Sequence, residues 1–399
     1  MKKLLILGAG IYQVPLIKTA QRMGVHTIVT SIAGNYPGFE IADSVYYENT
    51  VDAEAILKLA GKEHIDGIVT AGTDVAIPTV GAVCDNLGLR GLSAEAAKIS
   101  ANKKLMKEAY EANGVRTARF REISTDDMNY ADKLDGLSFP LIFKSVDSSG
   151  SRGITRVDSP AEFEAARQCV LDNTRSDYYL VEEFIEGEEF GAQAFVQDGK
   201  VEFILPHGDY VYTGNTGVPI GHFAPYDLPV EVIEDAKETL TAAIHAMKLD
   251  NCAINADFIL KDGKTYVLEI GGRSGATCLA ELVSIYYGYD YYEKIIQVAL
   301  GEKADFASSE ANANASHLLM ADKDGVIASQ SNNNEKNADG SYKDAGIVDI
   351  QFDYQPGDEV HKFRIGPHRI GHVITKGDSL DEAVKSLEAA QKNIIITVK

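Results

Sequence analysis

Tryptophan is absent from this sequence, cysteine is rare, and no apolar run approaches the length of a membrane span. The four cysteines (Cys84, Cys169, Cys252 and Cys278) lie far apart without a C-x-x-C pair, which argues against a structural zinc site and favours reduced thiols in a cytoplasmic protein. Basic residues are scarce too, with 38 Lys and Arg against 59 Asp and Glu and a net charge of −21. This deficit argues against binding to nucleic acid or to anionic lipid, but it leaves room for a local basic pocket around a nucleotide.

The 399 residues exceed one ordinary domain, and their pattern changes along the chain. In the first hundred residues the apolar runs K-L-L-I-L, H-T-I-V-T and D-G-I-V-T alternate with helical patterns, which predicts a parallel sheet of Rossmann-like shape. A helix is expected over residues 95–113. The later expected elements are strands at 139–146, 153–157 and 178–184, helices at 160–172, 230–247 and 278–300, a mobile polar loop at 329–346, and a closing helix and strand.

A loop of small residues follows the apolar run F-P-L-I-F-K. Residues 144–155, K-S-V-D-S-S-G-S-R-G-I-T, place Lys144 and Arg152 on either side of serines and glycines. Such a loop can turn several backbone N–H groups toward one point, and with two cations it suits the oxygens of a nucleotide's phosphates. An ordinary hairpin turn with surface charges is the alternative. The candidate phosphate ligands in the loop are Ser149, Gly150, Ser151, Arg152 and Gly153.

An acidic segment lies downstream, Y-L-V-E-E-F-I-E-G-E-E-F at residues 179–190. If phosphates lie under the loop, the backbone from Glu183 to Ile185 could offer one C=O and one N–H to an adenine edge. A carboxylate a few residues further on could accept hydrogen bonds from both ribose hydroxyls. A strand followed by a solvated acidic turn is the alternative.

Two strand-like runs flank a D-G turn in C-A-I-N-A-D-F-I-L-K-D-G-K-T-Y-V-L-E-I-G-G-R-S-G, residues 252–275. Asp257 and Glu269 lie on opposite arms of this hairpin. A three-residue loop from Asp262 to Lys264 would pair them on one face, whereas a two-residue loop would place them on opposite faces. We therefore predict the three-residue register, with both carboxylates holding Mg²⁺ beside a triphosphate. Exposed strand acids are the alternative for this pair taken alone.

Arg273 follows in the glycine-rich turn G-G-R-S-G, where its planar fork could hold a carboxylate or a phosphate. Walls for a substrate are expected from G-T-D at 72–74 and from residues 213–223. His222, in the second stretch, could meet a carboxylate together with Arg273 or serve as a structural histidine.

The G-A-G at residues 8–10 raises an alternative from another class, an NAD-dependent oxidoreductase. Gln13 stands where a third glycine would be needed, and the second strand ends without an acid for a ribose, so the motif predicts NAD binding only weakly. This alternative also leaves Lys144, Asp257 and Glu269 without a role.

Taken in order, these features closely resemble the ATP-grasp superfamily: a lysine in a helix, a lysine ending a strand, the glycine loop, E-E-F-I, E-G-E-E, and D…E-x-x-x-R on a hairpin. The resemblance covers nearly the whole chain, and residues 369–383 are similar to the closing segment of the purine-synthetase branch. It implies a mixed α/β and α+β ATP-grasp fold. The implied parts are a Rossmann-like pre-ATP-grasp domain (1–95), a linking helix (96–115), a lid subdomain with the glycine-rich loop (116–187), a metal and substrate subdomain (188–305) and a C-terminal α+β segment (306–399).

The resemblance also implies roles for single residues. Lys103 and Lys144 match lysines that contact ATP phosphates, and Lys144 and Arg273 match catalytic groups at the transferring phosphoryl. The loop at 148–153 matches a flap that closes over the phosphates. The remaining matches are Glu183 and Ile185 at the adenine, Glu189 at the ribose, and Asp257 and Glu269 as ligands of Mg²⁺ or Mn²⁺, and Glu182 is counted among the nucleotide-binding residues.

The activity that the resemblance implies is ATP-dependent ligation of a carboxylate to an amine through an acylphosphate, with release of ADP and phosphate. We expect an amino acid or peptide-like substrate, and a homodimer. A purine-biosynthesis-type synthetase or carboxylase is the alternative within the family. Gly271 stands where the family often has an asparagine as a third metal ligand, which leaves open a second metal and raises the alternative of nucleotide binding without catalysis.

Overall fold

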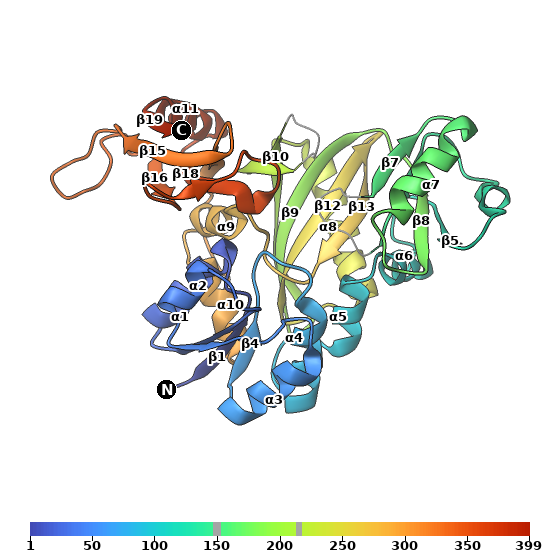
Figure 1. Cartoon of the computed structure of the whole chain (residues 1–399), viewed down its shortest axis with the longest axis horizontal. Coiled ribbons are helices and arrows are strands. Elements are labelled where there is room, and N and C mark those ends of the chain that lie inside the picture. Colours follow the sequence, from blue (N-terminus) through green and yellow to red (C-terminus); the bar gives the residue numbers. More distant parts are fainter. Residues whose placement is uncertain (147–152, 213–217) are drawn as a thin grey trace.

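The protein is described by a computed structural model that covers residues 1–146, 153–212 and 218–399. Four sheets organise these residues, one of them with eight strands. Figure 1 shows the N-terminal domain below the long central strands, the lid strands to their right and the C-terminal segment to their upper left. None of the helices in the described part of the chain is long and apolar enough to cross a membrane.

The N-terminal sheet is parallel, with the strand order β3-β2-β1-β4. Its strands are β1 (Lys3–Leu7), β2 (His26–Thr30), β3 (Ser44–Tyr46) and β4 (Gly67–Val69), and its helices are α1 (Val14–Arg22), α2 (Pro37–Ile41), α3 (Ala53–Glu63) and α4 (Ile77–Leu87). Leu4 and Ile6 pack with α1, whereas Leu5 and Leu7 pack with α3 and α4. The sheet is therefore buried on both faces, and the predicted Rossmann-like shape is confirmed.

The single helix predicted over residues 95–113 is wrong, because the linking segment holds two helices, α5 (Ala94–Ser100) and α6 (Lys103–Ala112). Asn102 separates them. Its side-chain oxygen accepts a hydrogen bond from the Leu105 N–H at 3.1 Å, which caps a new helix.

The helix predicted over residues 278–300 is also two helices, α9 (Leu279–Tyr287) and α10 (Tyr291–Ala299). Gly288 ends α9 in the left-handed conformation, at φ 70°. Asp290 then caps α10 through the Glu293 N–H.

The lid subdomain is an antiparallel sheet in the order β5-β8-β6-β7, covered by one helix. Its elements are β5 (Phe120–Ser124), β6 (Leu141–Lys144), β7 (Ile154–Val157), β8 (Tyr178–Glu183) and α7 (Phe163–Leu171). Ala166 and Val170 of α7 pack on Phe143 and Val181 of the sheet. The predicted strands and helix of this region are confirmed.

The eight-stranded sheet has the order β13-β12-β9-β10-β11-β14-β18-β16. Its strands are β9 (Glu188–Gln197), β10 (Lys200–Val211), β11 (Pro219–Ala224), β12 (Cys252–Lys261), β13 (Lys264–Gly271), β14 (Ala313–Met320), β16 (Ile347–Phe352) and β18 (Arg369–Gly377). Helix α8 (Val230–Ala246) packs on one face, where it meets Phe190, Ala192 and Ala194 of β9. Because side chains alternate along a strand, Gly191 and Gln193 lie on the opposite face.

A smaller sheet completes the C-terminal segment, with the order β17-β15-β19. The strands of this sheet are β15 (Gly325–Asn332), β17 (Glu359–Val360) and β19 (Ile394–Val398), and the segment also holds helix α11 (Leu380–Lys392). The loop predicted at 329–346 begins later than predicted, because residues 329–332 pair with β19. The rest of that stretch projects from the C-terminal segment in Figure 1.

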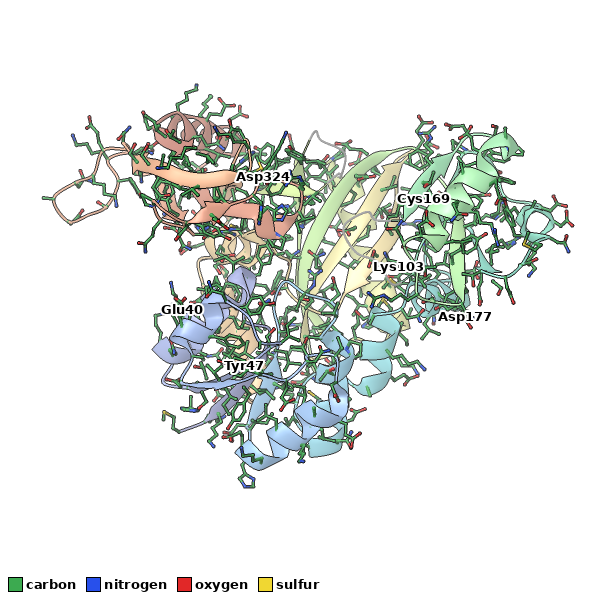
Figure 2. The ribbon with its side chains drawn as sticks, in the orientation of Figure 1. Glu40, Tyr47, Lys103, Cys169, Asp177 and Asp324 are labelled. Atoms are coloured by element: carbon green, nitrogen blue, oxygen red, sulfur yellow. The ribbon has the colours of Figure 1, made fainter. Side chains whose placement is uncertain are left out.

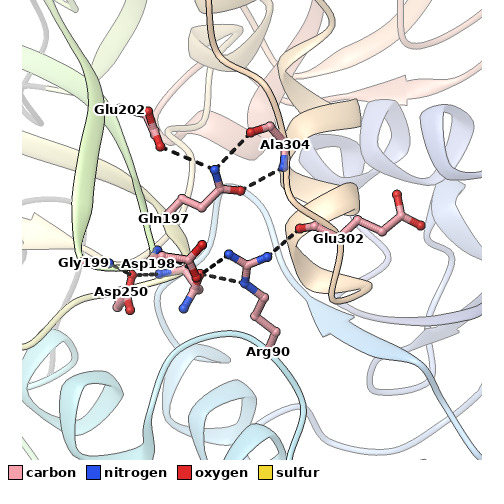
Figure 3. A network of polar contacts seen from close by, with 9 residues as sticks. Arg90, Gln197, Asp198, Gly199, Glu202, Asp250, Glu302 and Ala304 are labelled. Carbon is pink, nitrogen blue, oxygen red and sulfur yellow. Dashed lines mark hydrogen bonds and ion pairs between the residues drawn. The ribbon is translucent and has the colours of Figure 1, made fainter.

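Polar contacts of Arg90 fasten the N-terminal domain to the large sheet (Figure 3). Its Nε donates to Asn251 Oδ1 at 2.8 Å, and its two Nη atoms donate to Asp198 Oδ1 and the Glu302 carbonyl, each at 2.6 Å. One guanidinium thus joins three segments that are far apart in the sequence. Next to it, the Gln197 amide exchanges two hydrogen bonds with the backbone of Ala304.

Candidate active site

A row of polar positions crosses four strands of the large sheet on the face opposite α8. Asp257 pairs with Glu269 on one side and with Gly191 on the other, and Gly191 pairs with His207. A Cβ at Gly191 would overlap the His207 ring, so this glycine leaves room for the imidazole beside the two acids. Glu189, two residues earlier on the same face of β9, is exposed and lines the same cavity as Asp257.

Asp257 and Glu269 pair across the hairpin as predicted, but the three-residue loop that we expected is wrong. The turn has two residues, Asp262 and Gly263, with φ of 51° and 72°. Further along the arms the register shifts by one residue just before the acidic pair. Leu268 is the extra residue of this β-bulge, and it returns both carboxylates to one face.

The acidic pair has the chemistry of a divalent-cation site. Surrounding protein raises the pKa of Asp257 to about 7, and the neighbouring charge of Glu269 adds to the rise. The Asp257 side chain still reaches solvent in the cavity, so its charge is partly screened. A cation between the two carboxylates would offset their repulsion, and oxygen donors suit Mg²⁺ or Mn²⁺. The residues present therefore fit such a cation.

A cavity of about 630 Å³ opens over this row, and we call it the first cavity. Lys103, labelled in Figure 2, lies at the start of α6 and on the wall of this cavity. Its Nζ lies 3.4 Å from a Glu269 carboxylate oxygen. The first of the two predicted phosphate lysines therefore stands beside the acidic pair.

The second predicted lysine, Lys144, belongs to a buried ionic cluster. Its Nζ lies 2.5 Å from Glu182, whose other carboxylate oxygen lies 3.1 Å from Lys107. Burial would raise the pKa of Glu182, but the two lysines outweigh it and hold that pKa below its ordinary value. The Glu182 carboxylate is thus enclosed by two lysines, and it fixes the position of Lys144.

Lys107 was missed by sequence reasoning. Its side chain is 1% exposed and also donates to Thr117 Oγ1 at 2.7 Å. Burial lowers the pKa of Lys107 to about 8, against the opposing charge of Glu182. The signal was available, because Lys107 follows Lys103 by four residues and so shares one face of α6.

The segment predicted to meet the adenine runs from Glu183 to Ile185. The Glu183 carboxylate lies 3.0 Å from Arg119 and accepts from the Ser138 N–H at 2.8 Å, so that side chain is already engaged. Ile185 is buried against Ala118. Among the described residues, no hydrogen-bond partner faces the Ile185 N–H, which leaves it available for a ligand.

The predicted glycine loop lies mostly outside the described residues, including Ser149, Gly150, Ser151 and Arg152. Gly153 is described. It has a φ of +67°, and its carbonyl accepts from the Ser145 N–H at 3.0 Å.

Arg273 and Asp74, from two different domains, form a two-pronged ion pair. Arg273 Nε and Nη2 each lie 2.7 Å from an Asp74 carboxylate oxygen. Both side chains line the first cavity with Asp257. Asp74 of the G-T-D segment therefore lines the first cavity, and it fixes the plane of the Arg273 fork.

The His222 side chain contacts the Asp209 carboxylate. Its Nδ1 lies 2.6 Å from Asp209 Oδ1, and His207 Nδ1 lies 3.0 Å from the same oxygen. Asp209 lines the first cavity. His207 and Asp209 were not singled out in the sequence, although their i, i+2 spacing puts both on one strand face.

The G-A-G turn after β1 closes on itself. The Gly10 N–H donates to Gln13 Oε1 at 2.9 Å, and Gln13 also donates to the Ala71 carbonyl. A Cβ at Gly8 would overlap the Gln13 side chain. Gln13 thus fills the place where a dinucleotide pyrophosphate would approach, which removes support from the oxidoreductase alternative.

A second cavity of about 540 Å³ lies between α1, α9 and the strands β16 and β18. It adjoins the turn that carries Arg273, because Gly275 and Thr277 are part of its lining. Its charged lining residues are Lys18, Arg22, Glu281, Asp290, Asp349, Arg369 and His372.

Comparisons with known proteins agree with this geometry. The sequence pattern of the ATP-grasp domain matches residues 137–281, and that of the L-amino acid ligase C-terminal domain 2 matches residues 317–399. D-alanine–D-alanine ligase A of Clostridium perfringens is 30% identical over 233 residues, which cover 56% of this chain and 71% of that protein. The chain belongs to the ATP-grasp family. It is an ATP-grasp ligase with the mixed α/β fold that the resemblance implied.

Two more proteins are similar to this ATP-grasp ligase, and their names describe two different activities. A crystal structure of phosphoribosylglycinamide synthetase from Anaerococcus prevotii shares 36% identity over 100% of both chains, with a TM-score of 0.86. Alanine–anticapsin ligase of Bacillus subtilis is 24% identical over 67% of this chain and 62% of that protein. The family is thereby fixed, and the oxidoreductase alternative has no support.

Proposed function

We propose that this ATP-grasp ligase joins the carboxylate of one amino acid or peptide to the amine of a second, with release of ADP and phosphate. The observation that carries the proposal is the facing pair Asp257 and Glu269 in a cavity whose wall also holds Lys103 and Arg273. Paired carboxylates, lysines and an arginine fork are what positions a triphosphate against a second anion.

ATP lies in the first cavity in this proposal. Lys103 and Lys144 contact its phosphates, the Glu183 carbonyl and the Ile185 N–H meet the adenine edge, and Glu189 accepts from the ribose. Asp257 and Glu269 hold Mg²⁺, or Mn²⁺, which neutralises phosphate charge when bound.

The first step transfers the γ-phosphoryl to the carboxylate of one substrate and gives an acylphosphate. Arg273 steadies the negative oxygens of that transfer, because Asp74 fixes the direction of its guanidinium at two nitrogens. The amine of the second substrate then displaces phosphate and forms the amide.

The charge of the second cavity supports amino acids as substrates. Arg22 lies 2.5 Å from Asp290, Arg369 lies 2.7 Å from Asp353, and Lys18 faces Asp349. Each of these cations therefore has an acid beside it. A balanced lining suits a zwitterion, whereas a phosphate dianion calls for cations in excess. The match to the L-amino acid ligase domain over residues 317–399 points the same way.

A purine-type synthetase is the second candidate function. The whole-chain similarity to the structure described as a phosphoribosylglycinamide synthetase favours it. The balanced charges of the second cavity oppose it, because a phosphoribosyl substrate carries a dianion.

Release of ADP separates the two candidates. The enzyme would be given Mg-ATP with amino acids, singly and in pairs, and separately with glycine and phosphoribosylamine, and products would be read by mass spectrometry. The proposal expects ADP release that depends on a pair of amino acids, with a product lighter than their sum by one water. Turnover with glycine and phosphoribosylamine, but with no pair of amino acids, would replace the proposed function with the second candidate. Cytoplasmic localisation and a homodimer stay predictions.

A further inference from the structure

The second cavity contains an acid, Glu281, that has no cation in contact with it among the described residues. The cavity volume of about 540 Å³ suits a small-molecule site. Glu281 lies in the first turn of α9 and is part of the cavity lining, with its side chain half-buried. Its one side-chain hydrogen bond in the described part of the chain comes from the Tyr292 hydroxyl at 3.3 Å.

The other charges of this cavity have partners. Arg22 and Arg369 each pair with an aspartate. His372 Nδ1 accepts a hydrogen bond from Arg369 Nη2 at 2.6 Å, so the proton of the ring lies on Nε2, which donates to Asp349 at 2.8 Å. Lys18 also faces Asp349. The three cations thus have three aspartates as partners, and the glutamate is the acid that remains.

The turn before α9 connects this acid to the site of Arg273. Gly275, which lines the second cavity, follows Arg273 by two residues, so their Cα atoms are at most about 7.6 Å apart. Thr277 and Cys278 then adopt left-handed φ angles of 55° and 69°, which are uncommon outside functional turns. Side chains on a helix lean toward its N-terminus, so Glu281 leans back over this turn. Arg273 and Glu281 therefore flank one turn, and each faces one of the two cavities.

The surroundings of Glu281 favour a ligand that carries a positive charge. Burial raises the pKa of Glu281, while the neighbouring charges of His372 and Arg369 lower it. A half-buried carboxylate without a counter-ion is stabilised when a cation enters beside it. We propose that Glu281 binds the ammonium group of the amino acid whose carboxylate is activated, and so selects the carboxylate donor. This role of Glu281 rests on the proposed ligase function.

The charge of the amine decides which amino acid can occupy this place. An amine must be uncharged to attack an acylphosphate, because protonation removes its lone pair. A facing carboxylate favours the ammonium form. The amino acid held by Glu281 therefore reacts only at its carboxylate and becomes the N-terminal residue of the product. The second amino acid has to bind where no acid faces its amine.

A structural role is the alternative, because an acid in the first turn of a helix interacts favourably with the helix dipole. Helix α10 offers a matched comparison. Glu293 is the third residue of α10, as Glu281 is the third residue of α9, but Glu293 lines neither of the two cavities. A dipole effect should be similar for the two acids, whereas binding of a substrate ammonium requires Glu281.

The test measures activation of the carboxylate donor alone. With Mg-ATP, and with hydroxylamine in place of the second amino acid, the acylphosphate is trapped as a hydroxamate. The donors are compared in pairs of similar size: L-alanine with L-lactate, L-leucine with its 2-hydroxy analogue, and L-phenylalanine with L-phenyllactate. For the wild type, kcat/KM should be at least about 100-fold higher with the amino acid than with its hydroxy analogue.

Glu281→Gln should lower kcat/KM for the amino acid by about 10–100-fold and change that for the hydroxy acid by less than ~3-fold. Glutamine keeps an acceptor for the Tyr292 hydroxyl, so the variant should fold, and thermal unfolding checks this. Glu281→Asp should retain part of the preference for the amino acid, because the charge remains. Glu293→Gln should leave the preference unchanged.

Equal losses with both members of a pair in Glu281→Gln, or no loss with either, would overturn the role of Glu281. The same loss of preference in Glu293→Gln would also overturn it. A wild type that uses the amino acid and its hydroxy analogue equally well would overturn it without any variant. If the wild type forms a hydroxamate from neither member of any pair, the ligase function itself is refuted.

Discussion

Asp257 carries its charge at a position where the surrounding protein and the Glu269 carboxylate both oppose it. Its pKa is raised to about 7, so folding favours the protonated acid. The corresponding stability is complete below the pKa of an unfolded aspartate and is lost as the pH rises through about 7. A raised pKa of this kind is expected of a metal ligand in the absence of its cation. Without the cation, the charged carboxylate lowers the free energy of unfolding.

Asp257→Asn should therefore separate stability from function. In the absence of divalent metal, the variant should be more stable than the wild type by about 1 kcal/mol at pH 8, after allowance for screening in the open cavity. The difference should vanish near pH 4. ADP formation should fall by at least about 100-fold, because a metal ligand is lost. Urea unfolding at the two pH values checks the first part, and a variant less stable at pH 8 would contradict it.

Lys107 acts on Lys144 through Glu182, and its removal should show this coupling. Lys107→Met leaves the buried Glu182 with one cation and should cost about 3 kcal/mol of unfolding free energy. The KM for ATP should rise severalfold, because Lys144 loses its fixed position. Denaturant unfolding and ATP titration measure the two effects.

The matched control is the double variant Lys107→Met with Glu182→Gln. The double variant removes both buried charges together. Its loss of unfolding free energy should therefore be smaller, by roughly 1–3 kcal/mol, than the sum of the losses of Lys107→Met and Glu182→Gln measured singly. Simple additivity would show that Lys107 and Glu182 do not interact.

Among the elements, the β12–β13 hairpin shows what a sequence reveals of a register and what it conceals. The Asp262-Gly263 turn signal and the facing acids could both be predicted, and both are present. The two could be reconciled from the sequence only by a longer turn, but the chain uses a bulge at Leu268. Many types of residue can occupy a β-bulge, so the leucine at position 268 does not by itself predict one.

Helix α6 begins at Asn102, and this cap should govern how Lys103 and Lys107 enter the site. Asn102→Ala should lower the unfolding free energy by about 1 kcal/mol, because the Leu105 N–H loses its acceptor. The KM for ATP should rise as well, since fraying of the first turn moves Lys103. Thermal melting and ADP-release kinetics measure the two changes.

Asn102→Ser is the control for this prediction, because serine is also a good cap. It should recover most of the stability and of the affinity for ATP. If Ser and Ala behave alike, then the contact of Asn102 with the Tyr178 hydroxyl at 3.1 Å matters more than the cap.

For the whole molecule, the first cavity depends on how the N-terminal domain sits on the large sheet, because Asp74 and Arg273 come from these two parts. Arg90 makes one of the contacts that fix this arrangement (Figure 3). Arg90→Ala should lower the unfolding free energy by about 1–2 kcal/mol. It should also slow ADP formation by loosening the Asp74–Arg273 pair, although Arg90 lines neither of the two cavities.

Arg90→Lys keeps the charge but cannot span three acceptors, so it should resemble Arg90→Ala. Chemical unfolding and steady-state kinetics measure both variants. A lysine variant as stable and as active as the wild type would show that charge alone holds the two parts together.

The parallel sheet and the acidic hairpin could be predicted from the sequence because each has a local signature: alternating runs for the sheet, and paired acids around a D-G turn for the hairpin. Contacts between distant segments could not. Asp74 meets Arg273 across 199 residues, and Lys107 meets Glu182 between a helix and a strand. Such partners are set by domain packing, which leaves no pattern in either segment alone.

The most direct test of the central claim follows one carboxylate oxygen. An acylphosphate forms when that oxygen bonds to the γ-phosphorus, so it must leave with the phosphate when the amine attacks. With an amino acid labelled with oxygen-18 in its carboxylate, the account predicts one labelled oxygen in the released phosphate for each amide formed. Unlabelled phosphate, or AMP and pyrophosphate in place of ADP and phosphate, would contradict it.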